Sequence, residues 1–388
     1  MRYFFQFGVF QSLSLVELST VLETYGISKD SIKNIGGGVF LLESKLATPQ
    51  IISKIFSRLG GYIRYGEVIE DIDSFLPQFL EFKKVLFGVS FLDRGKVDRR
   101  SIEKLSNEIK KFFTNQGVSS RFILPKEGQL NEAQIRNNKI LEKGFEFVIF
   151  NTPTKQMYGR TLGVQDVESF VRRDIDRPKS DYDMGVLPQK LARIMCNLVG
   201  LKDGIIWDPF CGSGTILMEA AVLGFDILGT DIDQRAISNS HENILWLHRE
   251  GLIAGVKYNL FQLDIRNVEK KIVKDLQKTG IRAVVCEPFM GPVLRKVITS
   301  FKADTLLEEV KSLYTGLFKV LDTVAKKGFK VVLVIPSYKT LSGQRTLNIS
   351  SLIGKKWDVL NKVYSKEDLK WERNNSIITR NIFILSRR

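Results

Sequence analysis

Residues 208–215 read DPFCGSGT and decide the fold, because they place a glycine-rich turn between a predicted strand and a predicted helix. The sequence before the turn, GIIWDPF, is apolar and short, and the sequence after it, TILMEAAVLG, is long enough for a helix. Further predicted strands follow with helices between them: DILGTDID (226–233), VKYNLFQLD (256–264), IRAVVCEP (281–288) and KVVLVIPS (330–337). Consecutive units of this kind predict a doubly wound, Rossmann-like parallel sheet whose ligand binds at the carboxyl ends of the strands.

The glycine-rich turn can be compared with three kinds of ligand site. A phosphate-binding loop needs a lysine before its Ser/Thr, but Thr215 follows Gly214 directly. A dinucleotide fingerprint needs a third glycine three residues after Gly214, where Leu217 stands. S-adenosylmethionine has no phosphate and carries an ammonium, a ribose diol and an adenine. Gly212 and Gly214 would let the backbone approach its amino-acid end, and Asp208 suits its ammonium.

Two more acidic residues follow the next predicted strands. Asp231 ends ILGTD nineteen positions after Gly212, which is near the roughly 20-residue spacing of a ribose-binding acid. Asp264 ends QLD, where a carboxylate can accept the adenine amino group. We therefore predict S-adenosylmethionine as the cofactor and prefer this to a purely structural turn. The predicted binding residues are Asp208, Phe210, Gly212, Gly214, Thr215, Asp231 and Asp264.

The fourth strand of this region ends in CEPFMGP (286–292), which has the makings of a methyl-acceptor site. Exocyclic nitrogens of nucleobases are poor nucleophiles, because their lone pair is delocalised into the ring. A site for them needs an acceptor for the amino hydrogens, a flat stacking partner and alignment of the reacting atoms. Glu287 can be the acceptor, Pro288 stiffens the loop, and Phe289 can stack on an extruded base. The alternative is an ordinary turn with Phe289 in the core.

The charge of the chain points to a polyanionic partner. The 388 residues include 58 Lys and Arg against 43 Asp and Glu, a formal charge of +15, which favours nucleic acid or an anionic membrane surface. Residues 93–126 hold nine basic and four acidic side chains. This stretch reads as an amphipathic helix and a strand, so a solvated helix face is the alternative to an RNA contact. The candidate RNA-binding residues are Arg94, Lys96, Arg99, Arg100 and Arg121.

Several classes of protein are disfavoured. The longest apolar runs fall far short of the roughly 20 residues that span a bilayer. The first residues lack the pattern of a secretory signal. The three cysteines form no CxxC pair, so neither a zinc site nor a disulfide framework is indicated. We therefore expect a cytoplasmic protein that acts without a metal or a membrane, and nothing in the sequence demands more than a monomer.

The N-terminal half is organised differently from the C-terminal half. Residues 1–61 read strand, helix, strand, helix, and residues 62–151 alternate helices and strands, which predicts two small α+β units. Residues 152–188 are polar and carry both charge signs without a helical or strand period. We expect them to form a structured but irregular linker. The doubly wound domain then occupies residues 189–388.

These motifs together resemble a known family. DPFCGSGT with GTDID downstream resembles a class I S-adenosylmethionine methyltransferase, and LNEAQIRNNKILEKGFEFVIF resembles the end of a THUMP RNA-binding domain. QDVESFVRRDIDRPKSDYDMGVLPQKLARIMCNLVG is similar to the linker and first helix of THUMP-containing tRNA guanine-N2 methyltransferases. The resemblance implies an N-terminal ferredoxin-like domain (1–61), a THUMP domain (62–151), the linker and a Rossmann-like catalytic domain. It also implies methylation of a guanine exocyclic amine in tRNA.

The acceptor motif departs from that family. The family has Asp/Asn-Pro-Pro-Tyr/Phe, where this sequence has Glu-Pro-Phe-Met-Gly. An ungapped match puts Glu287 at the acid, whereas a one-residue slip puts Cys286 there and keeps Pro288 and Phe289 as the proline–aromatic pair. We favour Glu287 with Phe289 stacking, because the longer side chain could offset a shifted loop. The rival functions are methylation of ribosomal RNA or of an adenine amine, and an RNA-binding protein that has lost transfer.

Overall fold

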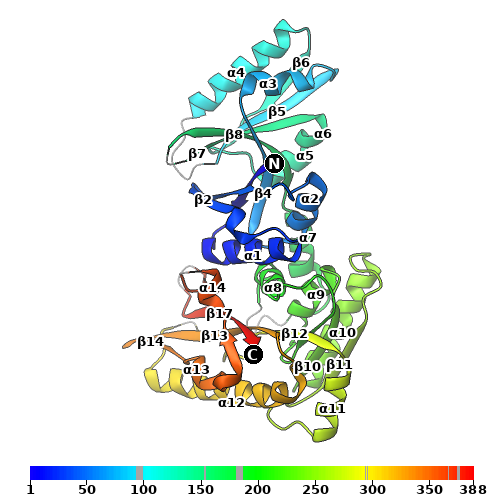
Figure 1. The fold of residues 1–388 in the computed structure, drawn as a ribbon, viewed down its shortest axis with the longest axis vertical. Helices are drawn as coiled ribbons and strands as arrows, with labels where there is room; N and C mark the ends of the chain where they lie inside the picture. Colours follow the sequence, from blue (N-terminus) through cyan, green and yellow to red (C-terminus); the bar gives the residue numbers. More distant parts are fainter. Residues whose placement is uncertain are drawn as a thin grey trace. The chain divides into compact units, whose positions relative to one another are not determined.

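The chain divides into two compact units, which are coloured along the sequence in Figure 1. The computed structural model describes residues 1–92, 99–152, 154–180, 187–292, 294, 296–365, 367–373 and 376–388. The first unit comprises Met1–Leu15 and Tyr25–Val167, and the second comprises Val16–Thr24 and Glu168–Arg388. Over these described ranges, no helix combines the length and the apolar character needed to span a membrane.

The first unit is built on one eight-stranded sheet in the order β2-β3-β1-β4-β8-β7-β5-β6. Its strands are β1 (Arg2–Phe7), β2 (Ile32–Gly36), β3 (Val39–Glu43), β4 (Tyr62–Ile69), β5 (Lys84–Phe91), β6 (Ser119–Ile123), β7 (Gly144–Asn151) and β8 (Gln156–Val164). β5 runs parallel to β6 and β7, and the other pairs are antiparallel. The parallel pairs require crossover connections, which the helices between these strands provide.

The helical segments of this part of the chain lie between its strands, and the first of them runs into the second unit from Val16. They are α1 (Gln11–Thr24), η1 (Lys29–Ser31), α2 (Pro49–Arg58), α3 (Ile72–Phe75), η2 (Leu76–Phe79), α4 (Arg99–Asn115), α5 (Glu132–Asn137) and α6 (Ile140–Lys143). In α4, Ile102, Ile109 and Phe113 recur at helical spacing and are buried in one cluster with Phe87 and Phe145 of the sheet. The predicted amphipathic helix therefore exists, and its charged residues lie on the remaining face.

The second unit contains the predicted doubly wound sheet, in the order β11-β10-β9-β12-β13-β17-β15 with β14 paired to β13 and β16 to β17. Its strands are β9 (Ile205–Asp208), β10 (Asp226–Asp231), β11 (Tyr258–Gln262), β12 (Ile281–Cys286), β13 (Lys330–Thr340), β14 (Gly343–Thr346), β15 (Trp357–Val359), β16 (Lys370–Trp371) and β17 (Ile378–Arg387). β9 to β13 are parallel, and β17 is antiparallel to β13. Because the chain turns from one side of β9 to the other, the carboxyl end of β9 is the switch point where ligands bind in such sheets.

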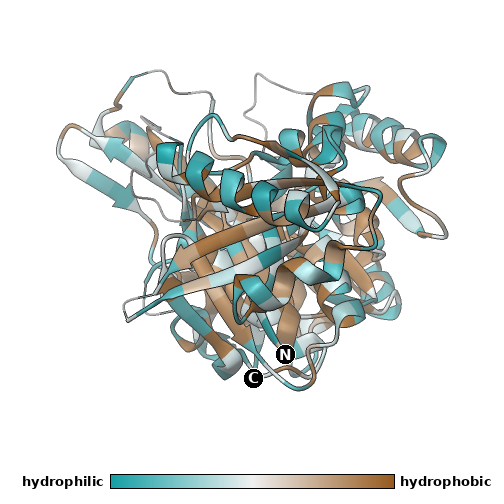
Figure 2. Ribbon diagram, turned by 90° about the horizontal axis from the view of Figure 1, so that it is seen from above, coloured by the Kyte–Doolittle hydropathy of each residue, from teal (hydrophilic) through white to brown (hydrophobic). Residues whose placement is uncertain are grey.

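Helices bury the faces of this second sheet. They are α7 (Val167–Val171), the π-helix η3 (Arg172–Asp176), α8 (Gln189–Asn197), α9 (Thr215–Val222), α10 (Gln234–Arg249), α11 (Lys270–Lys278), α12 (Ser300–Val324), α13 (Ser350–Ile353), η4 (Gly354–Lys356) and α14 (Asn361–Tyr364). In one core cluster, Leu317 and Leu321 of α12 lie with Val284 and Leu333 of the strands. Figure 2 shows hydrophobic residues gathered on the strands, while many helices carry hydrophilic residues along one side.

The predicted irregularity of residues 152–188 is wrong for a large part of that range. Residues 156–164 form β8, which pairs with β4 and β7, and two helical segments follow it. The strand was not predicted because its sequence is polar. In the structure one of its charged residues, Arg160, forms an ion pair with Glu67 of the neighbouring β4, with Nη2 2.9 Å from Oε1. The predicted boundary after residue 61 falls just before β4, yet strands from both sides of it share one sheet. The assignment of residues 1–61 and 62–151 to separate ferredoxin-like and THUMP domains stays a prediction.

A buried ion cluster fixes the segment after β8 to the second unit. The Glu219 carboxylate on α9 accepts hydrogen bonds from Arg173 Nε of η3 at 2.5 Å and from Arg193 Nε of α8 at 2.6 Å. All three side chains are almost completely buried, and both guanidinium groups lie over the Phe170 ring. Removing one partner of such a cluster leaves an uncompensated buried charge. The part of the predicted linker around Phe170 and Arg173 is therefore an integral part of the second unit.

Candidate active site

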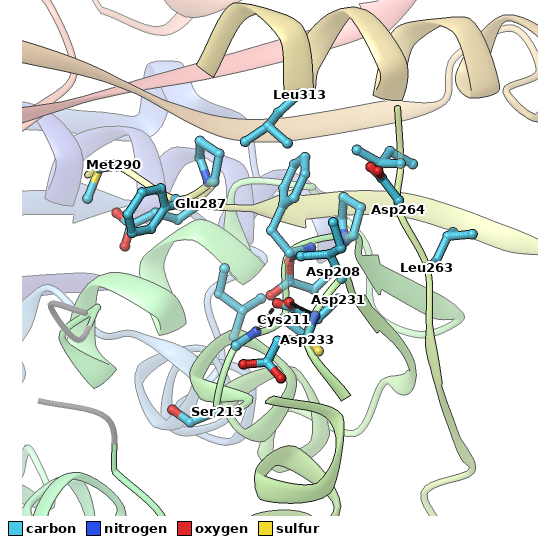
Figure 3. A pocket seen from close by; sticks show the side chains of 18 of the residues that line it. Asp208, Cys211, Ser213, Asp231, Asp233, Leu263, Asp264, Glu287, Met290 and Leu313 are labelled. Carbon is cyan, nitrogen blue, oxygen red and sulfur yellow. Dashed lines mark hydrogen bonds between the residues drawn. The ribbon is translucent and has the colours of Figure 1, made fainter. Parts of the chain in front are cut away.

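A cavity of about 330 Å³ lies at the carboxyl ends of β9 to β12 in the second unit. Figure 3 shows Asp208 and Asp231 side by side, with Glu287 and Asp264 on opposite sides of them. The cavity is lined by nine of the residues predicted from the sequence: Asp208, Phe210, Gly212, Thr215, Asp231, Asp264, Glu287, Pro288 and Phe289. Gly214 lies in the same loop at the start of α9. Residues predicted from three separate motifs are thus brought to one place.

The glycine-rich loop needs its glycines for different reasons. Gly214 caps α9 with φ +86°, and a Cβ there would meet Ser240 Oγ at 2.8 Å. Gly212 has φ +52°, and a Cβ there would meet no protein atom within 4 Å, so the loop leaves room on its cavity side. The Gly212 amide donates to Asp231 Oδ2 at 2.9 Å, and its carbonyl accepts from Ser240 Oγ at 2.8 Å. The left-handed backbone and the close approach both favour glycine.

Residues from the predicted linker hold this loop, which the sequence did not indicate. Arg177 Nη1 donates to Thr215 Oγ1 at 2.8 Å. Asn243 of α10 donates from Nδ2 to the carbonyls of Ser213 and Lys179, and its Oδ1 accepts from the Lys179 amide at 3.0 Å. The only hint in the sequence was the Arg177-Pro178 pair, which marks a turn. It does not identify Thr215 as the partner of Arg177, because the two residues are 38 positions apart.

Asp208 is the most buried carboxyl of the site, with 1% of its surface exposed. It ends β9, and its Oδ1 accepts from the Phe210 amide at 3.1 Å. Burial raises the pKa of Asp208 well above its ordinary value, and the nearby charges of Asp231 and Glu287 raise it further. A cation beside Asp208 would reverse both effects by favouring its ionised form.

Asp231 and Asp264 meet different surroundings at the next two strand ends. Asp231 accepts backbone hydrogen bonds from Gly212 and Asp233, and burial raises its pKa. Asp264 is held by Arg266, whose Nε and Nη2 lie 2.9 and 3.0 Å from the two carboxylate oxygens. These hydrogen bonds lower the pKa of Asp264. Arg266 was missed from the sequence, although an arginine two residues after a strand-end acid was a usable signal.

The charges of the cavity fit the predicted cofactor. Among the described residues that line it, one guanidinium, that of Arg266, faces six carboxyl groups: Asp208, Asp231, Asp233, Asp264, Glu287 and Glu309. Such a lining repels a phosphate and suits a ligand with positive charge. S-adenosylmethionine carries a sulfonium and an ammonium, and the open side of Gly212 leaves space for its amino-acid end. The donor set and the loop therefore fit this cofactor.

The three cysteines, by contrast, offer little chemistry. Cys196, Cys211 and Cys286 are buried, and none of them forms a disulfide. Burial raises the pKa of the Cys211 and Cys286 thiols well above the ordinary value, so they are poor nucleophiles and poor ligands. Within the described part of the chain, no group of three or more His, Cys, Asp or Glu side chains is arranged to hold a metal ion.

The predicted acceptor loop leaves β12 at the mouth of the cavity. Glu287 lines the cavity, whereas Cys286 is fully buried within β12 and does not line it. This difference favours the ungapped match to the family motif over the one-residue slip. The Phe289 side chain is 41% exposed, so the alternative that places it in the core is wrong. Tyr338 of β13 donates its hydroxyl to the Met290 carbonyl at 2.8 Å, which fixes the loop.

The sequence also missed a cationic partner of Glu287. Arg380 of β17 donates from Nε to Glu287 Oε1 at 2.6 Å and from Nη2 to Oε2 at 3.4 Å. A weak signal existed in the sequence, because Arg380 lies two and four positions before the buried Ile382 and Ile384 and therefore on the same face of the strand. An inward-facing arginine needs an acid, but the sequence does not say which.

The candidate RNA-binding residues belong to the first unit. Arg99 and Arg100 are the first two residues of α4, and Arg121 lies on β6, and all three are exposed. Arg94 and Lys96 lie outside the described residues. Arg99, Arg100 and Arg121 therefore lie in the solvent-facing part of the α4–β6 region, where a phosphate backbone could reach them.

Comparison with known proteins agrees with this geometry. The RMKL-like methyltransferase domain family, UPF0020, matches residues 178–288. A tRNA (guanine(10)-N2)-dimethyltransferase of Methanocaldococcus jannaschii is 34% identical over 318 residues, which cover 73% of this chain and 80% of that protein. Proteins of the same name from Methanothermobacter thermautotrophicus and Pyrococcus abyssi are 26% and 28% identical, over 89% and 72% of this chain and 90% and 80% of theirs.

Replacing Asp208 by asparagine should flatten the pH dependence of cofactor binding. Because the pKa of Asp208 is raised, the carboxyl becomes neutral as the pH falls through that value, and a bound ammonium must first ionise it. Affinity for S-adenosylmethionine should therefore rise with pH in the wild type until the pH exceeds the raised pKa of Asp208, and rise less steeply in the variant. Titration calorimetry over this range measures the difference, with Asp226→Asn at the opposite edge of the sheet as control.

The same variant should be more stable than the wild type at neutral pH. A folded-state pKa above the unfolded value means that stability is lost as the pH rises through the folded pKa. Asparagine removes this loss and keeps an oxygen for the Phe210 amide. A variant whose affinity follows pH as in the wild type would contradict the role given to Asp208.

Proposed function

Because the chain belongs to the family of the tRNA (guanine(10)-N2)-dimethyltransferases, we propose that it methylates the exocyclic N2 amine of guanine 10 in tRNA with S-adenosylmethionine as the donor. The observation that carries the proposal is the juxtaposition of Glu287 and Phe289 with the glycine-rich loop around one cavity. The position within tRNA and the transfer of a second methyl group come from the names of the relatives.

The bound cofactor supplies an electrophilic methyl group, and the residues of the chain do the rest. Glu287 accepts a hydrogen bond from the N2 amine, which turns the nitrogen lone pair out of conjugation with the ring. The exposed Phe289 stacks on the extruded base, and Pro288 restricts the loop. The new carbon–nitrogen bond would replace the carbon–sulfur bond of the donor, which would leave as the neutral thioether, and the amine would lose one proton, which Glu287 accepts and passes to solvent. Most of the barrier reduction comes from this alignment.

The first unit supplies RNA binding in this proposal. Arg99, Arg100 and Arg121 contact phosphates, and residues 62–151 act as a THUMP domain after a ferredoxin-like segment. Phosphate contacts position the RNA and the catalytic pocket reads the base. The cytoplasmic location and the monomeric state predicted from the sequence are part of the same proposal.

Unmodified tRNA transcripts should accept labelled methyl groups from S-adenosylmethionine only when position 10 carries an N2 amine. Replacing guanosine 10 by inosine removes that amine and leaves the rest of the base unchanged, so incorporation should be lost. Nucleoside analysis of the product should give N2-methylguanosine and N2,N2-dimethylguanosine. Ribosomal RNA serves as the control substrate.

Other outcomes of this assay identify the rival functions. Equal incorporation into the inosine transcript contradicts the proposed position. Methylated adenosine, or transfer to ribosomal RNA alone, supports the alternative acceptors. Binding of tRNA and cofactor with no transfer supports the RNA-binding protein that has lost activity.

Replacing Glu287 by alanine should lower the rate of methyl transfer by about 10²–10⁴-fold while cofactor affinity changes little. Glu287→Gln should be less damaging than Glu287→Ala, because its one amide oxygen still accepts a hydrogen bond from the base amine, although its NH2 group then faces the Arg380 guanidinium. Single-turnover rates with saturating tRNA and cofactor measure the effect. An undiminished rate in Glu287→Ala would show that another group accepts the amine.

The double variant Arg99→Ala/Arg121→Ala should weaken the salt dependence of tRNA binding. Each lost phosphate contact lowers the slope of log affinity against log salt by roughly 0.7–0.9. Filter binding across a range of salt concentrations measures this slope, and cofactor affinity should stay unchanged. The matched control is Lys326→Ala/Lys327→Ala, two exposed charges just before β13. Equal slopes in both double variants would remove Arg99 and Arg121 from the RNA-binding surface.

A further inference from the structure

The ion pair between Glu287 and Arg380 joins the acceptor loop to the last strand of the sheet. The two side chains are 10% and 11% exposed, so the pair is largely shielded from water. Nε lies 2.6 Å from Oε1, whereas Nη2 lies 3.4 Å from Oε2, at the long limit for a hydrogen bond. Oε1 is thus firmly engaged by Arg380, and Oε2 keeps most of its capacity to accept another hydrogen bond.

Arg380 is itself held in a fixed place. It belongs to β17, where it pairs with Pro336 of β13 and with Trp371 of β16. Its guanidinium lies over the Trp371 ring, with Cζ 5.0 Å from the ring centroid. The arginine therefore reaches Glu287 from a rigid strand with its planar group packed on an indole.

We infer that Arg380 is a positioning residue for methyl transfer, which holds Glu287 by Oε1 and presents Oε2 to the base amine. The inference rests on the proposed function. The family motif has Asp or Asn at this position, and Glu287 has one more rotatable bond. A free glutamate would lose that freedom on binding the base, whereas Arg380 orders it beforehand.

The guanidinium also supplies a charge that the site needs. Asp208, Asp231 and Glu287 lie close enough for the charges of the other two to raise the pKa of Asp208. Arg380 compensates the charge of Glu287 on the side of the acceptor loop, and Arg266 compensates Asp264 on the other side. A lysine at position 380 would keep this charge but would lose the planar, two-point contact.

The test compares Arg380→Met and Arg380→Lys with the wild type in single-turnover methylation of tRNA. Arg380→Met should lower the rate about 10- to 100-fold, as expected for a misplaced reacting group, with the affinities for cofactor and tRNA within about twofold of the wild type. Arg380→Lys should recover part of the rate. In a Glu287→Ala background, Arg380→Met should cause no further loss, because nothing remains to be positioned.

The same strand offers a matched control in Arg387. It pairs with Asp322 at 3.1 Å, its Cζ lies 5.5 Å from the Trp357 ring centroid, and its side chain is 13% exposed. Arg387→Met therefore removes a similar ion pair and a similar indole contact at the far end of β17. It should leave the rate of transfer within about twofold of the wild type, because an ion pair whose acid is partly exposed to solvent contributes little to stability.

The outcomes separate this inference from the proposed function. An active wild type with an equally active Arg380→Met overturns the inference alone. Equal losses in Arg380→Met and Arg387→Met, or parallel losses of rate and cofactor affinity, assign Arg380 a merely structural role and also overturn it. A wild type that methylates no tRNA overturns the proposed function and the inference with it. If Arg380→Met does not fold, Arg380→Lys alone must still lower the rate without weakening cofactor binding.

Discussion

Repulsion among carboxyl groups at the carboxyl edge of one parallel sheet is the constraint on which the site depends. Asp208, Asp231, Asp264 and Glu287 lie at the carboxyl ends of β9, β10, β11 and β12. β10 and β12 flank β9 on either side of the switch point. Each group is accommodated differently. Burial raises the pKa of Asp208, and two backbone amides donate to Asp231. Arg266 and Arg380 neutralise the outer two acids, which leaves a central negative region for a cationic ligand.

The segment that leads into the catalytic unit is more than a connection. Its middle part is fixed by the ion pair of Arg173 with Glu219 in a buried cluster. Its last described residues brace the glycine-rich loop, because Arg177 donates to Thr215 and the Lys179 carbonyl accepts from Asn243, which also donates to the Ser213 carbonyl. The conformation of the cofactor loop therefore depends on residues that precede the domain predicted from the sequence. This dependence gives a physical reason for the polar, charged composition of residues 152–188, where the sequence alone indicated an irregular linker.

The altered acceptor motif becomes understandable once the strand partner of Glu287 is known. A longer acid in place of Asp or Asn is free to adopt more conformations, and in this protein a guanidinium from β17 limits them. Tyr338 fixes the loop three residues after Glu287, by donating a hydrogen bond to the Met290 carbonyl. The loop thus differs from the family pattern in its residues, while its acid and its aromatic side chain still meet at the cavity.

The sequence by itself determined the doubly wound sheet, the glycine-rich loop and the acids at the strand ends. These features depend on residues close together in the chain and on a general rule, that parallel strands end at one edge. The strand β8 and the pairs of Arg177 with Thr215 and Arg380 with Glu287 were decided only by the tertiary structure. Arg177 and Thr215 are 38 residues apart in the sequence, and Arg380 and Glu287 are 93 residues apart. The charge of an arginine does not by itself select one partner among the many acids and hydroxyls of the chain. Folding selects them, because only the packed sheet brings one specific acceptor within reach of each buried guanidinium.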